Sequence, residues 1–239
     1  MKKIVLCEGD SWTAGDIINP KLDIDYVNHR DNDSYRLPKV WPHKLGEMIN
    51  KKNLHDTNVI NQSVAGSSND GIVRRTLLKI PRLLEKYKGK EIFVIVGWSS
   101  PERKDFFYND GKRKHWETLY PAQLGQKFHS GYKDLNKFYE IYVDKFWNRE
   151  EYIQRYTEQN LLLHHYLNHH NIDHMFFDAF YNAPKVVDKK RNSFYNFMML
   201  EPMNANTLWD GQAGKGGHPN EKAHKMWAEE IYNDIKNKL

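Results

Sequence analysis

The sequence of 239 residues predicts one α/β domain, a three-layer α/β/α sandwich with a mostly parallel sheet of about five strands. Two observations lead to this prediction. Short apolar runs alternate along the chain with longer segments in which apolar residues recur at helical spacing. The clearest run, residues 91–96 (EIFVIV), is almost entirely apolar and β-branched, as expected for a central strand that is buried on both faces. A chain of this length can form a single domain, residues 1–239, with a substantial core.

The predicted strands are short and apolar. The first is followed directly by glycine, and the third is the run described above. Because helical segments separate them, neighbouring strands should run parallel. Strands are expected at residues 3–8, 59–60, 91–96 and 173–179, with a short fifth strand near residues 197–200.

Four helical segments are predicted from apolar residues at intervals of three or four. The second should begin with Asn69 or Asp70 as its N-cap, and Pro81 should kink or break it. The third is interrupted near Asn148, which predicts two helices. The segments lie at residues 41–52, 69–87, 133–168 and 219–238.

Between the third strand and the fourth lies a helical and aromatic insertion, at about residues 98–170. Its first part, residues 98–130, is a long connection, and such connections usually carry function or small elements of their own. Its aromatic residues would either form a wall for a sugar or an acyl group or pack the insertion itself. They are Trp98, Phe106, Phe107, Trp116 and Tyr120.

Composition excludes several classes of protein. The net charge is +5, but Lys and Arg are scattered rather than clustered, so nucleic acid is not an expected partner. No apolar stretch approaches the roughly 20 residues of a membrane span, and the four apolar residues after Lys3 are too few for a secretory signal. The single cysteine, Cys7, lies in the first predicted strand, so no disulfide can form within the chain. These features predict a cytoplasmic protein, in a host cytoplasm if it is viral.

Four polar segments fall at the predicted carboxyl ends of strands or just before a helix. Open parallel sheets place their chemistry at such positions. The first segment contains a serine and the last a histidine, which can meet in space if the intervening strands form one sheet. The segments are Gly9-Asp10-Ser11, residues 61–69, residues 97–100 and residues 217–220 (GHPN).

In this order the four segments resemble those of the SGNH/GDSL hydrolase family, over residues 4–231. The resemblance implies a flavodoxin-like sandwich and ester hydrolysis without a cofactor. Ser11 matches the family's nucleophile, and His218 matches the base that takes the proton of the serine hydroxyl. The backbone N–H groups of Ser11 and Gly66 match two donors of the oxyanion hole, where glycine lets the backbone approach the substrate. Asp10 is expected to brace the turn rather than to take part in the reaction.

Two positions depart from the family's pattern. Ser99 stands where the family has the Asn of a Gly-x-Asn segment, so the third oxyanion donor would be Ser99, Asn69 or Ser100. Lys215 stands three residues before His218, where the family has Asp. Asp210 is the nearest acidic residue upstream, and the glycine-rich residues 211–217 could fold it back toward the histidine. Otherwise the site would be a Ser-His dyad.

Histidines elsewhere have simpler interpretations. His165 and His169 have the i, i+4 spacing of two metal ligands on one helix face. No acidic or cysteine ligand supports them at a suitable spacing, so this segment is predicted to be a polar helix end and no metal site is expected. His224, six residues after His218, is expected on the surface or in packing.

The sequence therefore predicts a serine esterase or deacetylase whose substrate is a small ester or an acylated carbohydrate. The alternative is an inactive module with the same fold that binds a partner or serves a structural role, for instance in a phage particle. Lys215 and Ser99 favour the alternative. The run from Gly97 to Arg103 (GWSSPER) looks like a variant found in hydrolase-like proteins of tailed bacteriophages.

Overall fold

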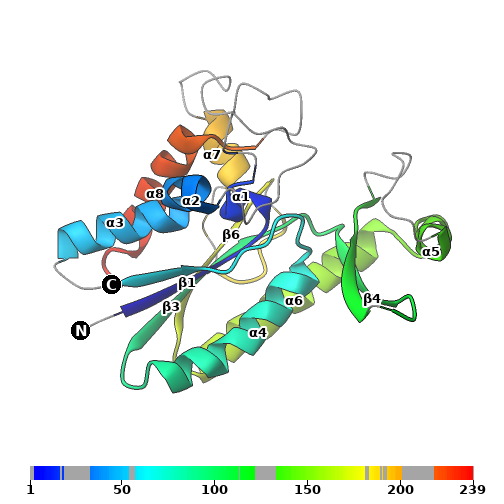
Figure 1. The fold of residues 1–239 in the computed structure, drawn as a ribbon, viewed down its shortest axis with the longest axis horizontal. Coiled ribbons are helices and arrows are strands. Elements are labelled where there is room, and N and C mark those ends of the chain that lie inside the picture. The colour runs from blue at the N-terminus through cyan, green and yellow to red at the C-terminus, as the bar shows by residue number, and fades with distance from the viewer. Residues whose placement is uncertain are drawn as a thin grey trace.

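The centre of the protein is a parallel sheet of four strands in the order β2-β1-β3-β6 (Figure 1). The computed structural model describes residues 3–16, 18, 33–53, 57–112, 114–121, 133–180, 183–188, 190, 193–200 and 218–238. Within them all three strand pairings of this sheet are parallel, which confirms the predicted α/β class. The strands are β1 (Lys3–Glu8), β2 (Asn58–Asn61), β3 (Glu91–Trp98) and β6 (Asp173–Asp178).

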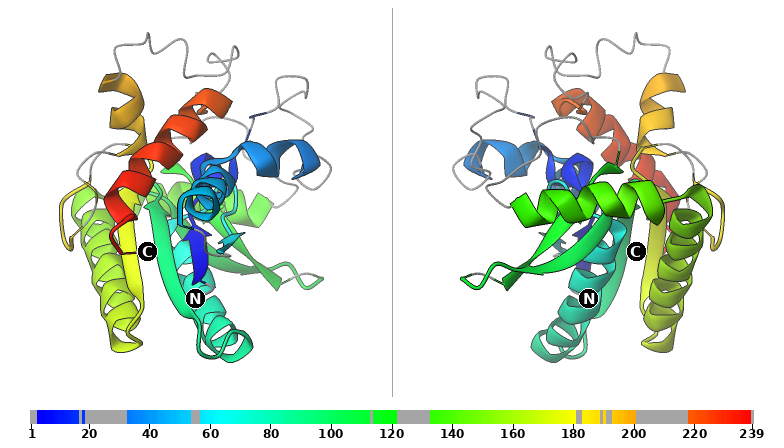
Figure 2. Two further views of the ribbon diagram at one scale, coloured as in Figure 1. Left: turned by 90° about the vertical axis from the view of Figure 1, so that its left-hand side faces the viewer. Right: turned by 90° about the vertical axis from the view of Figure 1, so that its right-hand side faces the viewer.

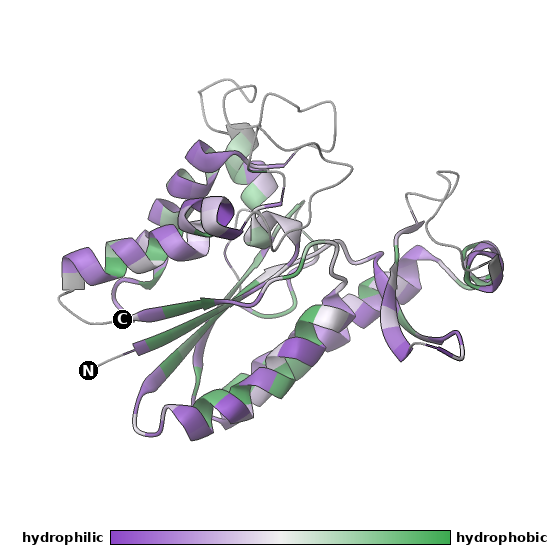
Figure 3. Ribbon diagram, viewed as in Figure 1, coloured by the Kyte–Doolittle hydropathy of each residue, from purple (hydrophilic) through white to green (hydrophobic). Residues whose placement is uncertain are grey.

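Helices cover both faces of this sheet (Figures 1 and 2). α3 (Trp41–Asn53) and α8 (Glu221–Ile235) lie on one face, and α4 (Asn69–Lys86) and α6 (Arg149–His169) lie on the other. The side chains of β1 alternate between the two resulting cores, because successive residues of a strand point to opposite faces. Hydrophobic residues are concentrated in the strands and on the inner sides of the helices (Figure 3). The shorter helices are α1 (Ser11–Ala14), α2 (Asp33–Arg36), the 3-10 helix η2 (Leu37–Lys39) and α7 (Phe194–Leu200).

The connection after β3 forms a small unit with its own core. β4 (Lys104–Asn109) and β5 (Lys114–Leu119) make an antiparallel hairpin, and α5 (Lys133–Lys145) packs across one face of it (Figure 2). Leu119, Phe106 and Tyr142 belong to this third apolar cluster. α6 follows and packs on the main sheet, so only the hairpin and α5 stand away from the sheet.

Two local predictions were wrong, those of the fifth strand and of the N-cap of α4, and the break expected as one alternative at Pro81 does not occur. Residues 197–200 belong to helix α7 and not to a fifth strand, because Phe194 and Phe197 use helical spacing to pack against Trp227. Pro81 does not break α4, which continues as one helix to Lys86. Its N-cap is Ser68, whose hydroxyl accepts a hydrogen bond from the Gly71 N–H at 3.1 Å.

The interruption near Asn148 is confirmed. Asn148 caps α6 by accepting a hydrogen bond from the Glu151 N–H at 2.8 Å, as Asn does at helix starts. Cys7 is buried in β1, as expected. Within the ranges given above, no helix is both long and apolar enough to cross a bilayer.

Candidate active site

Ser11 begins helix α1 immediately after the turn that ends β1. Asp10 caps this helix, since its Oδ1 accepts a hydrogen bond from the Trp12 N–H at 3.0 Å. Gly9 fits a crowded place, where a Cβ atom would collide with the Thr13 side chain and lie 3.1 Å from the Gly97 carbonyl oxygen. Gly9 and Asp10 thus suit the geometry of the turn, and Ser11 beside them is 6% exposed at the carboxyl end of the sheet.

The loop after β2 runs beside this turn. The Val64 N–H donates to the Gly9 carbonyl at 3.2 Å, and the Gln62 N–H donates to the Cys7 carbonyl at 2.9 Å. Two residues past Val64, Gly66 has φ 76°, a conformation that favours glycine. Among the described residues, no acceptor takes a hydrogen bond from the backbone N–H of Ser11 or of Gly66.

Ser99 and Asn69 join the end of β3 to the start of α4. The Asn69 Oδ1 accepts from the Ser99 N–H at 2.8 Å, and its Nδ2 donates to the Ser99 carbonyl at 3.1 Å. The Ser99 hydroxyl donates to Asp10 Oδ2 at 3.0 Å. Two of the three side chains that the sequence offered as oxyanion donors, Ser99 and Asn69, therefore lie beside the serine turn, and each already makes hydrogen bonds within the protein.

Arg103 is a central residue that sequence reasoning did not select. Its Nη1 donates to the Ser99 hydroxyl at 2.7 Å, to the Ser67 carbonyl at 3.1 Å and to Asp10 Oδ2 at 3.2 Å. Only the unusual run that ends in Arg103 hinted at it, because contacts with residues 36 and 93 positions away leave no local pattern.

The Asp10 carboxylate is fully buried among these partners. Burial raises its pKa, while the charge of Arg103, hydrogen bonds from Trp12 and Ser99, and the charge of His218 lower it. Asp10 braces the turn as predicted, and it also connects three segments of the site.

His218 lies two residues before the N-cap of α8, which is Asn220. The Asn220 Oδ1 accepts a hydrogen bond from the Ala223 N–H at 3.0 Å, which fixes the start of the helix. The charge of His218 lowers the pKa of Asp10, in the serine turn, and the pKa of His224, and the residue is half-buried. Asp210 and Lys215 lie outside the described residues.

His224 is a core residue of α8. Its ring is fully buried against Phe194, and its Nδ1 accepts a hydrogen bond from the Trp41 N–H at 3.2 Å. Burial lowers its pKa to about 3, helped by the charges of His218 and Arg36. The ring is therefore neutral at neutral pH, and its role is packing, one of the two roles expected for it.

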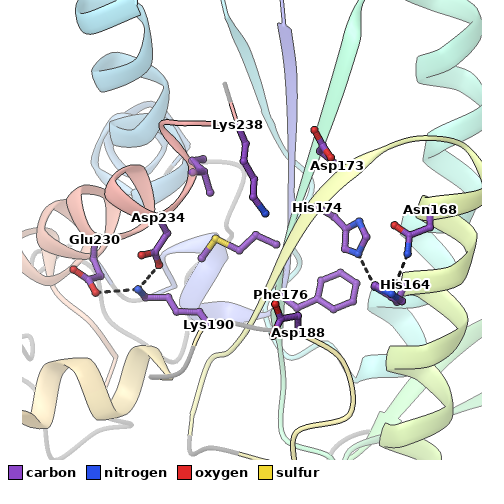
Figure 4. A pocket seen from close by; sticks show the side chains of 12 residues that line it. His164, Asn168, Asp173, His174, Phe176, Asp188, Lys190, Glu230, Asp234 and Lys238 are labelled. Atoms are coloured by element: carbon purple, nitrogen blue, oxygen red, sulfur yellow. Dashed lines mark hydrogen bonds and ion pairs between the residues drawn. The ribbon is translucent and has the colours of Figure 1, made fainter.

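The histidine-rich segment lies at the other end of β6, in a hollow of about 540 Å³ (Figure 4). His164 Nδ1 and His174 Nε2 are 2.9 Å apart, and Asn168 Nδ2 is 2.9 Å from His164 Nε2. These contacts form a chain of hydrogen bonds between α6 and β6. In the part of the protein that the structure describes, no group of three His, Cys, Asp or Glu side chains is placed to hold a metal ion.

The aromatic residues that were expected either to form a wall or to pack the insertion lie in different surroundings. Trp98 is fully buried between Tyr156 and Phe176, so it is a core residue. Phe106 packs against α5. Phe107 and Trp116 form an exposed pair across the hairpin, with 5.3 Å between the centroids of their rings. Tyr120 donates a hydrogen bond from its hydroxyl to the Gly66 carbonyl.

A parallel sheet covered on both faces, with a Gly-Asp-Ser turn after its first strand, is the arrangement expected from the resemblance to the SGNH/GDSL hydrolases. The chain is similar in fold to a lipase/acylhydrolase from Enterococcus faecalis, with a TM-score of 0.51 and 15% identity, over 100% of this chain and 97% of that one. Another similar structure is the psychrotrophic esterase EstA from Pseudoalteromonas sp., with a TM-score of 0.48 and 16% identity over 99% and 98% of the two chains. The chain belongs to a family of unknown function, DUF6071, whose model matches residues 24–239. No protein with a curated description matches the sequence.

Proposed function

We propose that the protein is a serine hydrolase that cleaves a small acyl ester. The observation that supports this most is the pair of backbone N–H groups, of Ser11 and Gly66, that have no acceptor among the described residues while their loops are hydrogen-bonded to each other. Such donors suit the oxyanion that forms when a serine attacks a carbonyl carbon. His218, whose charge lowers the pKa of Asp10 in the same turn, suits the role of base.

The proposed reaction has two halves. The Ser11 hydroxyl oxygen bonds to the ester carbonyl carbon while His218 takes the hydroxyl proton, and the tetrahedral oxyanion is held by the two backbone N–H groups. The C–O bond to the alcohol then breaks, and His218 returns the proton to the leaving oxygen. Water attacks the acyl-enzyme by the same route and releases the acid and the free serine.

Substitution of the nucleophile tests this function. Ser11→Ala should lower hydrolysis of p-nitrophenyl acetate by about 10³-fold or more and abolish labelling by a fluorophosphonate probe, with an unchanged far-UV spectrum. Ser63→Ala, in the loop after β2, is the matched control, since the Ser63 hydroxyl bonds to Asn61 and not to the turn. Equal turnover by Ser11→Ala and the native protein would exclude this mechanism.

A non-catalytic binding module is the second candidate. It is favoured by the Ser99 hydroxyl and the Asn69 amide, which are engaged by Asp10 and by the Ser99 backbone. A folded native protein that resists the fluorophosphonate and hydrolyses no short ester would support it.

We propose an acylated carbohydrate as the substrate class. The exposed pair of Phe107 and Trp116 supports this, because aromatic rings at a surface offer apolar faces to sugars. Release of acetate from acetylated oligosaccharides should exceed hydrolysis of p-nitrophenyl esters of long acids, and the reverse order would exclude the proposed class.

A further inference from the structure

We infer that Arg103 is a positioning residue for the proposed hydrolysis, one that holds the Gly66 loop against the serine turn. This inference rests on the proposed function for its kinetic consequence. Its structural basis is a single nitrogen, Nη1, that bonds to three segments far apart in the sequence: Asp10 after β1, Ser67 after β2 and Ser99 after β3.

The contact with Ser67 bears most directly on the oxyanion site. Ser67 follows Gly66, so a bond to the Ser67 carbonyl restrains the peptide next to the proposed donor. On the other side, the Tyr120 hydroxyl donates to the Gly66 carbonyl. The Arg103 guanidinium lies 5.0 Å from the centroid of the Tyr120 ring, so both restraints belong to one assembly.

Charge explains why an arginine occupies this place. The Asp10 carboxylate is fully buried, and a buried charge is costly without a partner. Arg103 supplies that partner while its own side chain stays 16% exposed. Its guanidinium also lies 5.0 Å from the Phe180 ring centroid, and the Arg155 side chain donates to the Arg103 carbonyl at 2.9 Å. Side chain and backbone of Arg103 are thus both fixed.

Arg103 also accounts for the altered third segment. The Ser99 hydroxyl accepts from Arg103 and donates to Asp10, so Ser99 serves as a link in this assembly. In this chain Ser99, at the position where the family pattern has an asparagine, links Asp10 to Arg103, and Arg103 in turn binds the Ser67 carbonyl next to Gly66.

Removal of the guanidinium should impair the chemical step more than binding. Arg103→Met should lower kcat by about 10²-fold, because a displacement of the reacting geometry by about 1 Å has that effect, and KM should change by no more than about threefold. Arg103→Lys should recover part of this loss, since an ammonium restores the charge but cannot match the fixed geometry of a guanidinium.

Lys190→Met is the matched control. Lys190 is a poorly exposed cation that bonds to Glu230 at 2.9 Å and to Asp234 at 2.5 Å, in the hollow at the far end of β6 (Figure 4). Its loss removes a comparable ion pair without contact with the serine turn, so kcat should stay at the native value.

Hydrogen exchange supplies a readout that does not depend on activity. Arg103→Met should speed amide exchange in residues 62–68 by at least about tenfold relative to Lys190→Met, with exchange in the remaining sheet unchanged. Native kcat and native exchange in Arg103→Met would overturn the inference, as would equal losses of kcat in Arg103→Met and Lys190→Met. If the native protein is not labelled by fluorophosphonate, the proposed function fails, and faster exchange confined to residues 62–68 still supports the positioning role.

Discussion

Replacement of His224 by asparagine is expected to reduce the loss of stability that this protein undergoes in acid. His224 is fully buried, and its Nδ1 accepts the Trp41 N–H, so that nitrogen carries no proton in the folded state. Protonation would place an uncompensated charge in the core beside Phe194 and would face the charges of His218 and Arg36. The folded state therefore keeps this ring neutral.

The size of the effect follows from the two pKa values. Burial lowers the pKa of His224 from its ordinary 6.5 to about 3 in the folded state. Because the pKa of His224 is lower in the folded state than in the unfolded state, its contribution to the stability of the folded state is complete above pH 6.5. This contribution is lost as the pH falls toward 3. Each pH unit in this window is worth about 1.4 kcal/mol, so acidification from pH 7 to pH 4 costs about 3 kcal/mol through this residue alone. That is a large fraction of the 5–15 kcal/mol typical of a folded domain.

Urea unfolding at pH 7, 6, 5 and 4, followed by tryptophan fluorescence, measures the effect. His224→Asn keeps an acceptor for the Trp41 N–H and cannot gain a proton, so its lost ring packing should cost the same at every pH. The native advantage over His224→Asn should shrink by about 3 kcal/mol from pH 7 to pH 4. His169→Asn, at an exposed position on α6, should leave the native pH dependence unchanged. Parallel curves for the native protein and His224→Asn would refute the reasoning.

The remaining predictions concern Glu8 and two glycines. Burial raises the pKa of Glu8 to about 7 despite its ion pair with Arg75. The contribution of Glu8 to the stability of the folded state is therefore present below pH 4.5 and is lost as the pH rises to 7. Glu8→Gln should therefore gain about 3 kcal/mol relative to the native protein between pH 4 and pH 8, and no such gain in urea unfolding would contradict this assignment. Gly89→Ala, at φ 75° with open space around it, should cost about 1–2 kcal/mol of strain. Gly66→Ala, at φ 76°, would also collide with the Tyr120 hydroxyl, so it should lower the melting temperature further and slow ester hydrolysis. If Gly66→Ala melts at the same temperature as Gly89→Ala and hydrolyses esters at the native rate, Tyr120 does not restrain Gly66.

The parts of the fold that could be predicted were those that depend on short-range sequence patterns. β3, α3 and the break at Asn148 were visible because apolar spacing and a capping residue act within a few positions. The apolar residues near 197–200 were misassigned, since a short apolar run fits a strand or a helix equally well. Packing of Phe194 and Phe197 against Trp227 selects the helix.

The site was predictable where it depends on the residue type at a strand end. Ser11 follows the turn at Gly9, and Gly66 lies on the loop that hydrogen-bonds to this turn. Asp210 lies outside the described residues and stays a prediction. Trp98 was left open between a wall and packing because the predicted strand ended at residue 96. β3 in fact continues to Trp98, which packs against Tyr156 of α6.

The amino-acid sequence by itself determined the α/β class, the position of most helices and strands, and the Gly-Asp-Ser turn, because each depends on residues that are close in the chain. Only the tertiary structure decided what surrounds that turn. Arg103 reaches Asp10 and Ser67 because β1, β2 and β3 end at the same edge of one parallel sheet. His224 is neutral because it is buried where α8 packs against α3 and α7. Burial and charge pairing between distant segments are properties of the folded packing, and no local pattern encodes them.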